Sequence, residues 1–330
     1  MKRLDLSKID GANCGENSFI ECDEFIHQGE FSIGDNIEIT SKKIYLGINA
    51  RIGDGTKIHA LKDVMTSFYM GDESEIGFSS QVMVPEFAIG DYTRIFNSSL
   101  CSGYKPLKIG HNCWIGQASI LNSAEDLTIG NNVRMGSVQI WTHVASGELL
   151  EGCRFYSEKP VTIEDNVWLM GFGHTVSPGV TIKRNSIVMS GSVVTKSTEA
   201  FHTYSGVPAV DVTENLNGWD NPTLEEKFEM LKGFIEEFIK NYPTYKDLVF
   251  CLDSENDNSE LEKILSNSTP FLIFLKEVQN IEKYTDSSHS IFDLKSKTYT
   301  KRRTDIEIDW MKFSISYRAR FIPFTEDVKQ

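Results

Sequence analysis

The chain has 330 residues, enough for two domains, and 40% of them are apolar, an ordinary share for a soluble protein. The formal net charge of −14 argues against general nucleic-acid binding, which relies on a basic surface that neutralises phosphates. The six cysteines form no CxxC pair, which favours reduced thiols over a disulfide framework or a structural zinc site.

The N-terminal stretch opens with two basic residues and turns polar before an apolar core of signal-peptide length is reached. No later run approaches the roughly 18 consecutive apolar residues of a membrane span. We therefore expect an uncleaved, cytoplasmic chain with no integral membrane segment. The stretch 1–30 is less regular than the one that follows and is predicted to form a capping coil.

From Ile33 onward, pairs of an aliphatic residue and glycine open one hexapeptide after another. Three hexapeptides make a longer period of roughly 18 to 20 residues, whose leading aliphatic residues are Ile33, Ile52, Met70, Ile89, Ile109 and Ile129. An aliphatic residue at every sixth position suits a triangular coil. It points inward, each side is a short extended strand, and successive coils pair as parallel strands. The sequence therefore predicts a parallel β-solenoid.

One long loop interrupts this period. The next leading aliphatic residue after Ile129 is Ile163, which lies well beyond one period, and the surplus falls in the loop 141–160, which carries His143. The hexapeptides then continue to about position 209. A histidine on a loop that leaves a regular scaffold is the pattern of a grafted active site.

The segments around this loop resemble the hexapeptide-repeat acyltransferase family, in its sugar and polysaccharide O-acetyltransferase branch. The motifs that carry the resemblance are, in order, TIGNNV, THVASGELLEG, YSEKPVTIEDNVWL, PGVTIKRNSIVMSGSVVTK and GVPA. The resemblance covers roughly 30–209 and implies a left-handed parallel β-helix, an exception to the usual right-handed crossover. It further implies acetyl-CoA as acyl donor, a carbohydrate acceptor, no required metal, and a homotrimer with active sites between adjacent subunits.

We accordingly expect a mainly β fold with three parts. Residues 1–209 form a left-handed β-helix acetyltransferase domain with a catalytic loop at 141–160, and the polar, turn-rich residues 210–222 form a linker. Residues 223–330 form a small α+β domain that resembles no family we can name, with acceptor recognition as one role for it. The elements expected there are a helix at 223–241 with a capping box from Thr223 to Glu226, a helix starting at Ser259, and strands at 247–252, 271–276 and 312–317.

The resemblance implies that His143 is the general base for direct acetyl transfer in a ternary complex. A free imidazole has a pKa near 6.5 and can take the proton of a sugar hydroxyl at neutral pH. Glu148 and Glu151 on the same loop are candidates to orient its other nitrogen, and the spacing does not decide between them. Without a second adjacent base, Cys153 is interpreted as a bystander thiol.

Further candidate residues follow from the same resemblance. Trp168 matches a tryptophan beside the acceptor pocket, and an outward position at a subunit interface is the alternative. The small residues expected along the pantetheine arm of CoA are Gly171, Gly173, Ser190 and Gly191. The cations expected for its phosphates are Lys183, Arg184 and Lys196. One residue more than a hexapeptide separates Leu169 from Val176, which indicates either a bulge that presents His174 or a tolerated irregularity.

Three other functions remain open at this stage. N-acetyl transfer to an amino sugar, free or nucleotide-linked, would use a similar base and donor. A zinc carbonic anhydrase would need three histidine ligands, and only His111 and His143 are suitably placed. A trimeric scaffold with a binding tail is the non-enzymatic alternative, in which the basic run 295–303 meets an anionic glycan; a solvated strand edge is the simpler interpretation of that run.

Overall fold

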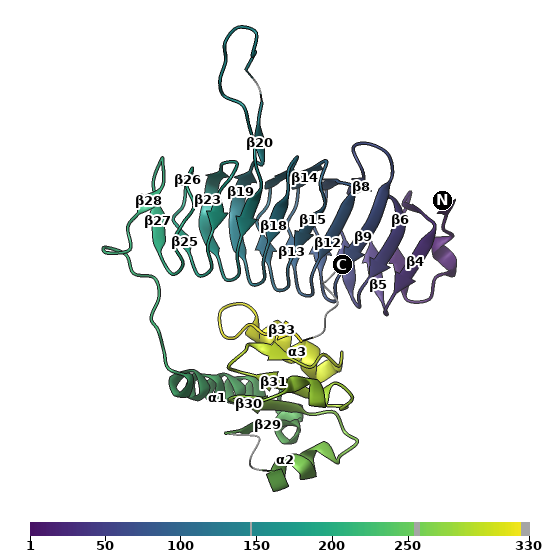
Figure 1. The fold of residues 1–330 in the computed structure, drawn as a ribbon. Helices are drawn as coiled ribbons and strands as arrows, with labels where there is room; N and C mark the ends of the chain where they lie inside the picture. The colour runs from purple at the N-terminus through teal and green to yellow at the C-terminus, as the bar shows by residue number, and fades with distance from the viewer. Residues whose placement is uncertain (146, 254–257, 325–330) are drawn as a thin grey trace. The chain divides into compact units, whose positions relative to one another are not determined.

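The computed structural model describes residues 1–145, 147–253 and 258–324. The chain divides into two compact units, Met1–Trp219 and Asp220–Gln330, which we describe separately (Figure 1). Within the described residues, none of the helices combines the length and the apolar character needed to cross a membrane.

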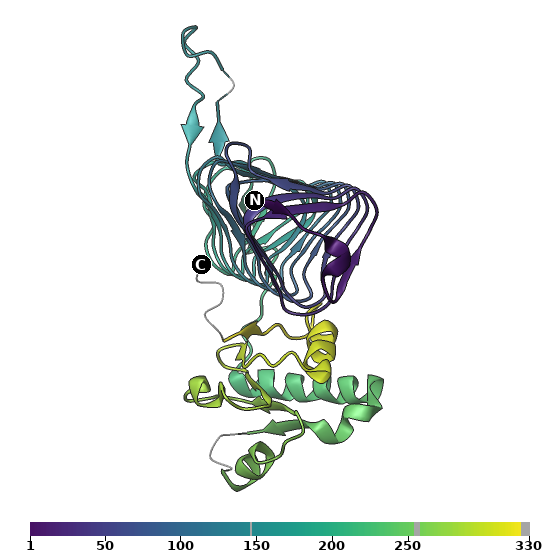
Figure 2. The same ribbon diagram turned by 90° about the vertical axis from the view of Figure 1, so that its right-hand side faces the viewer.

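The first unit is a three-sided solenoid of parallel strands, and Figure 2 shows its coils end on as stacked triangles. Face one consists of β2 (Ala12–Cys14), β5 (Phe31–Ile33), β7 (Ala50–Ile52), β10 (Glu75–Ile76), β13 (Arg94–Ile95), β16 (Trp114–Ile115), the first parts of β19 (Arg134–Ile140) and β23 (Trp168–Val176), β25 (Ile187–Val188) and β27 (Thr203–Ser205).

Face two consists of β3 (Phe19–Cys22), the first part of β6 (Glu38–Leu46), β8 (Lys57–His59), β11 (Gln81–Met83), β14 (Leu100–Gly103), β17 (Ile120–Ser123), the last parts of β19 and β23, and β26 (Val193–Val194). Face three consists of β4 (Glu24–His27), the rest of β6, β9 (Met65–Met70), β12 (Glu86–Ile89), β15 (Leu107–Ile109), β18 (Leu127–Ile129), β22 (Val161–Ile163) and β24 (Thr181–Ile182).

The leading aliphatic residues of the hexapeptides fill the interior of this solenoid. Ile33, Ile52, Met70, Ile89, Ile109 and Ile129 are each at most 3% exposed. They belong to one continuous core that runs the length of the coils. Because each aliphatic side chain stacks on its equivalent in the next coil, every coil depends on its neighbours for burial. The predicted parallel β-solenoid is confirmed.

One coil is longer than the sequence pattern suggests. Ile52 pairs with Ile76 of the following coil, a separation wider than the expected period. The additional length forms the loop 60–64 between β8 and β9. The evenly spaced series therefore changes side: Ile52 lies on face one, whereas Met70 lies on face three. The expected regular period is therefore wrong for this coil. Ile52 and Met70 lie on different faces of one coil, and they match the expected spacing because the loop 60–64 lengthens the chain between them.

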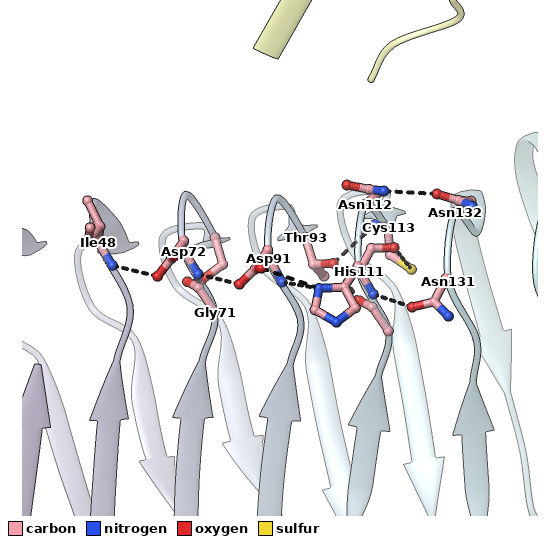
Figure 3. Close-up of polar contacts among 12 residues, drawn as sticks. Ile48, Gly71, Asp72, Asp91, Thr93, His111, Asn112, Cys113, Asn131 and Asn132 are labelled. Carbon is pink, nitrogen blue, oxygen red and sulfur yellow. Dashed lines mark hydrogen bonds and ion pairs between the residues drawn. The ribbon is translucent and has the colours of Figure 1, made fainter. Parts of the chain in front are cut away.

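A ladder of polar side chains joins successive coils at the corner between faces three and one (Figure 3). The Ile48 amide donates to Asp72 Oδ1 at 2.9 Å, and the Asp72 amide donates to Asp91 Oδ1 at 2.8 Å. The Asp91 amide then donates to His111 Nδ1 at 2.9 Å, and the His111 amide donates to Asn131 Oδ1 at 2.8 Å. These bonds satisfy corner amides that lie outside the strand ladders.

Both ends of the solenoid carry an antiparallel strand. At the N-terminal end, β1 (Lys2–Arg3) pairs with β3 and is followed by the 3-10 helix η1 (Leu6–Lys8). At the other end, β28 (Val210–Asp211) folds back on β27. The segment predicted as a linker at 210–222 therefore begins with residues that hydrogen-bond as part of the last coil.

The second unit is a five-stranded sheet with helices. Its elements are α1 (Leu224–Asn241), η2 (Pro243–Leu248), β29 (Val249–Leu252), α2 (Asn258–Leu265), β30 (Leu272–Leu275), η3 (Ile281–Tyr284), β31 (Ser290–Asp293), β32 (Thr298–Tyr299), α3 (Asp305–Ser314) and β33 (Ile322–Pro323). The strand order is β29-β30-β31-β32-β33, antiparallel only between β31 and β32. The Trp310 ring packs 4.7 Å from Phe274 and 5.4 Å from Phe238, which joins α1 and α3 to the sheet.

The predicted helix at 223–241 is confirmed with both bonds of its capping box, and the strands at 247–252 and 271–276 correspond to β29 and β30. The helix expected from Ser259 corresponds to α2, which begins at Asn258. The strand predicted at 312–317 is wrong, because its first half belongs to α3. Thr304 caps this helix by accepting from the Glu307 amide, and Ile306, Trp310 and Ser314 form its buried face.

Candidate active site

His143 lies at the base of a hairpin that leaves the solenoid at the corner between faces two and three. Its strands are β20 (His143–Val144) and β21 (Ser157–Glu158), which pair antiparallel with His143 opposite Glu158. Figures 1 and 2 show the hairpin projecting from the coils. Neighbouring coils turn this corner within a short stretch, so the insertion predicted at 141–160 is where the chain departs from the regular scaffold.

The His143 ring is oriented by an asparagine of the solenoid. His143 Nδ1 lies 2.9 Å from Asn122 Oδ1, and Asn122 is only 7% exposed. The amide orientation is fixed because Asn122 Nδ2 donates to the Ser102 carbonyl and the Ala124 amide donates to Oδ1. An amide oxygen can only accept, so Nδ1 must carry the proton. The lone pair of Nε2 is then available to take a proton from a substrate.

Thr142 anchors the hairpin next to this bond. It is fully buried, and its hydroxyl lies 3.1 Å from the Asn122 carbonyl and 3.0 Å from Asn122 Oδ1. The same hydroxyl accepts from the Glu125 amide at 3.0 Å. The backbone on which His143 stands is therefore tied to the preceding coil, which limits the movement of the imidazole.

Glu148 and Glu151 lie elsewhere on the hairpin. Both side chains are exposed, and Glu148 contributes its backbone carbonyl to the Cys153 amide. Among the described residues, neither carboxylate forms a hydrogen bond or ion pair with His143, whose Nδ1 is occupied by Asn122. The sequence alone did not identify Asn122 as the partner of His143. The signal that could have found it is its separation of 21 residues from His143, which places it one coil earlier.

The irregular coil whose strand β23 begins at Trp168 contains a β-bulge. The pairing of β19 with β23 shifts register around Ser137, which pairs with Phe172. Gly171 and Gly173 flank Phe172 with φ values of 73° and 80°, a region that favours glycine. Phe172 is 72% exposed and Trp168, on the same strand, is 46% exposed. The bulge therefore presents Phe172.

His174 is not presented by this bulge. It is 1% exposed, and its Nε2–H donates to the Met170 carbonyl at 2.6 Å. Burial lowers the pKa of His174, since the charged form is poorly solvated there. The expectation that the extra residue presents His174 is wrong, because the residue that turns outward is Phe172.

The small residues expected along the CoA arm come together at one corner. Ser190 Oγ accepts from the Phe172 amide at 3.3 Å and lies 3.2 Å from the Phe172 carbonyl, while the Gly191 amide donates to that carbonyl at 2.9 Å. Ser190 and Gly191 thus hold the bulge formed by Gly171 and Gly173. All four residues are exposed, so this corner offers backbone groups with few side chains in the way.

The three expected cations do not form one cluster in this chain. Lys183 and Arg184 follow β24, whereas Lys196 follows β26 two corners later. Lys183 is paired with Glu199 at 2.8 Å, and this partner raises the pKa of Lys183. The Arg184 guanidinium lies 6.0 Å from the centre of the Phe201 ring. Lys196 is exposed.

His111 and His143 are held by different groups, His111 in the corner ladder of Figure 3 and His143 by Asn122. Across the part of the chain that the structure describes, no three His, Cys, Asp or Glu side chains are grouped as metal ligands. The six cysteines are free thiols.

The basic run 295–303 is largely engaged within its own unit. Lys295 pairs with Glu277, and the Arg302 guanidinium donates to the Tyr284 carbonyl at 2.5 Å. Buried Glu307 accepts from the backbone amides of Arg302 and Arg303. These contacts tie the segment around β32 to the rest of its own unit.

Comparison with known proteins adds sequence relatives to this geometry. No protein-family model matches the sequence. The chain is 29% identical over 157 residues to galactoside O-acetyltransferase of Escherichia coli. The aligned stretch covers 46% of this chain and 76% of that protein. It is 37% identical over 103 residues to galactoside O-acetyltransferase of Lactococcus lactis, which covers 30% of this chain and 48% of that protein.

Among solved structures, a maltose O-acetyltransferase of Clostridium difficile is 21% identical over 53% of this chain and 68% of its own, with a TM-score of 0.26. The chain is thus similar in sequence to galactoside O-acetyltransferases, and its first unit is a three-sided parallel β-solenoid of hexapeptide repeats.

Proposed function

We propose that the protein transfers acetyl from acetyl-CoA to a hydroxyl of a carbohydrate, with His143 as general base. The observation that carries this proposal is the bond between His143 Nδ1 and Asn122 Oδ1, which in the neutral imidazole places the proton on Nδ1 and the lone pair on Nε2 of a half-buried ring. A base needs this tautomer before it can accept a proton. The similarity to galactoside O-acetyltransferases supports the choice of a sugar hydroxyl.

The reaction proceeds in one complex that holds both substrates. His143 Nε2 takes the proton of the acceptor hydroxyl while that oxygen attacks the thioester carbonyl. The new C–O bond forms, the C–S bond breaks, and the CoA thiolate leaves with the proton that the imidazolium returns. A positioned base contributes about 10²–10⁴-fold to the rate, and juxtaposition of the two substrates supplies much of the rest.

The donor is assigned to the corner that carries the bulge. Small residues allow close approach of the pantetheine arm to backbone amides, and the group consists of Gly171, Gly173, Ser190 and Gly191. Lys196 is the cation for the CoA phosphates, since Lys183 already has a carboxylate partner. Trp168 stands exposed at the start of the same strand and is assigned to the acceptor side.

The proposal includes a homotrimer in the cytoplasm that acts in surface-polysaccharide or glycoconjugate synthesis. The exposed apolar residues Trp168, Phe172 and Val207 support assembly, because packing of solenoids against one another would remove them from water. Light scattering on the purified chain tests the oligomeric state. The role of 223–330 in acceptor recognition stays a prediction.

Thiol release from acetyl-CoA tests the proposal, with methyl β-galactoside, maltose, sialic acid and glucosamine as acceptors. We expect His143→Ala to lower kcat/KM by at least about 100-fold on the best acceptor. His59→Ala is the control, because His59 lies in an early coil and contacts the Ala60 carbonyl. Equal rates in wild type and His143→Ala would exclude the assigned base. Transfer to the amine of glucosamine alone would favour the N-acetyltransferase alternative.

A further inference from the structure

The residue opposite His143 in the hairpin is a carboxylate with no role in the mechanism above. His143 and Glu158 are register partners in the β20–β21 pair. The Lys159 amide donates to the Thr142 carbonyl at 2.9 Å, which makes the adjacent pair the hydrogen-bonded one. His143 and Glu158 therefore form a non-hydrogen-bonded pair, whose Cα atoms lie about 4.5 Å apart and whose side chains share one face.

Tyr156 orients this carboxylate. Its hydroxyl donates to Glu158 Oε2 at 2.8 Å, and the same bond raises the pKa of Tyr156. Within the described residues, Tyr156 is the one hydrogen-bond partner of the Glu158 carboxylate, and no Lys or Arg pairs with it. Glu158 is exposed and is the register partner of His143. Its carboxylate is a directed hydrogen-bond acceptor on the face that carries His143.

An ionised carboxylate accepts hydrogen bonds and repels anions. A carbohydrate offers hydroxyl donors on carbons next to the reacting one. With one hydroxyl at His143 Nε2 and a second at Glu158, an acceptor is held at two points, and the reacting oxygen is aimed by the second bond. Glu125 is a further carboxylate whose charge adds to the raised pKa of Tyr156, and it also lies 4.0 Å from Lys105 Nζ.

We propose that Glu158 is an acceptor-binding residue that receives a hydrogen bond from a hydroxyl neighbouring the one acetylated, and that the acceptor is uncharged at this position. This inference rests on the function proposed above. It places nucleotide-linked and acidic sugars among poor substrates. Tyr156 is a positioning residue that acts through Glu158.

The test is a double-mutant-style cycle that combines Glu158→Ala with monodeoxy analogues of methyl β-galactoside. Loss of a hydrogen bond to a charged group corresponds to roughly 10- to 100-fold in kcat/KM for the acceptor. We expect that loss in Glu158→Ala, which removes the acceptor oxygens, with an unchanged KM for acetyl-CoA. One deoxy analogue should show the same loss with wild type and little further loss with the variant, and Tyr156→Phe should show a smaller loss.

Ser157→Ala is the matched control, because Ser157 lies on the opposite face of the same hairpin and should leave kcat/KM unchanged. If the wild type transfers acetyl but Glu158→Ala does so equally well, or if sialic acid is the preferred acceptor, the inference is wrong and the proposed function stands. If the wild type acetylates none of the galactosides or the other acceptors tested above, both are wrong.

Discussion

Asn122 holds the imidazole of His143 in the tautomer that a general base requires, through an Nδ1–H···Oδ1 bond of 2.9 Å. The two residues come from successive coils, so the solenoid itself sets the orientation of the ring. The hairpin thus supplies the proposed base His143, and the solenoid supplies its partner Asn122.

Asn122→Ala removes the acceptor for Nδ1–H, and we expect kcat to fall at least about 10-fold because the ring can then rotate or change tautomer. Asn122→Asp keeps an oxygen at that position and should retain more activity. Steady-state kinetics measures both variants, and circular dichroism checks that they are folded. Two folded variants with wild-type kcat would show that Asn122 does not position the base.

Gly136→Ala tests the close approach of the bulged coil. A Cβ at position 136 would overlap the Gly171 carbonyl oxygen, so the backbone must move. We expect a loss of unfolding free energy of about 1–3 kcal/mol or more, together with weaker acetyl-CoA binding. Thermal unfolding and calorimetric titration measure the two effects. Ser137→Ala is the neighbouring control and should stay within about 0.5 kcal/mol of wild type; equal stability of both variants would contradict the clash.

The first helix of the second unit should respond in opposite directions to two substitutions. Thr223→Ala removes the cap of α1 and should cost about 1 kcal/mol. Gly233→Ala adds a methyl group that meets nothing within 4 Å and should stabilise the helix by about 0.5–1 kcal/mol. Amide hydrogen exchange across 224–241 reports both. Faster exchange in Gly233→Ala would show that the position needs glycine for another reason.

Asp211 should make the last coil sensitive to acid. Hydrogen bonds from Thr213 and His202 lower the pKa of Asp211 to about 2, from an ordinary value of 3.8. A depressed carboxyl pKa stabilises the fold fully above 3.8, and that stabilisation is lost as the pH falls towards 2. The protection factors of the amides in 203–213, which correct for the intrinsic pH dependence of exchange, should therefore fall over this window in wild type. Asp211→Asn should exchange faster than wild type at pH 7 and approach it at low pH; a constant difference would exclude Asp211 as the titrating group.

The roles expected for the small residues and for the basic residues stay predictions. The small residues lie together in the solenoid, whereas the basic residues do not. Gly171, Gly173, Ser190 and Gly191 meet at one corner because they occupy equivalent positions in successive coils, a relation that the hexapeptide period already contains. The spread of Lys183, Arg184 and Lys196 over different corners follows from the same period, applied to residues that are close in sequence but on different faces.

The sequence by itself determined the solenoid, the position of the inserted hairpin and the first helix of the second unit. Each depends on a local pattern: an aliphatic residue at every sixth position, an overlong gap between Ile129 and Ile163, and a capping box before an amphipathic run. Only the tertiary structure decided that Asn122 is the partner of His143, that Phe172 turns outward while His174 is buried, and that Glu158 stands opposite His143. These depend on which residues of separate coils and strands come into register, and inserted loops alter that register in ways that a local pattern does not contain.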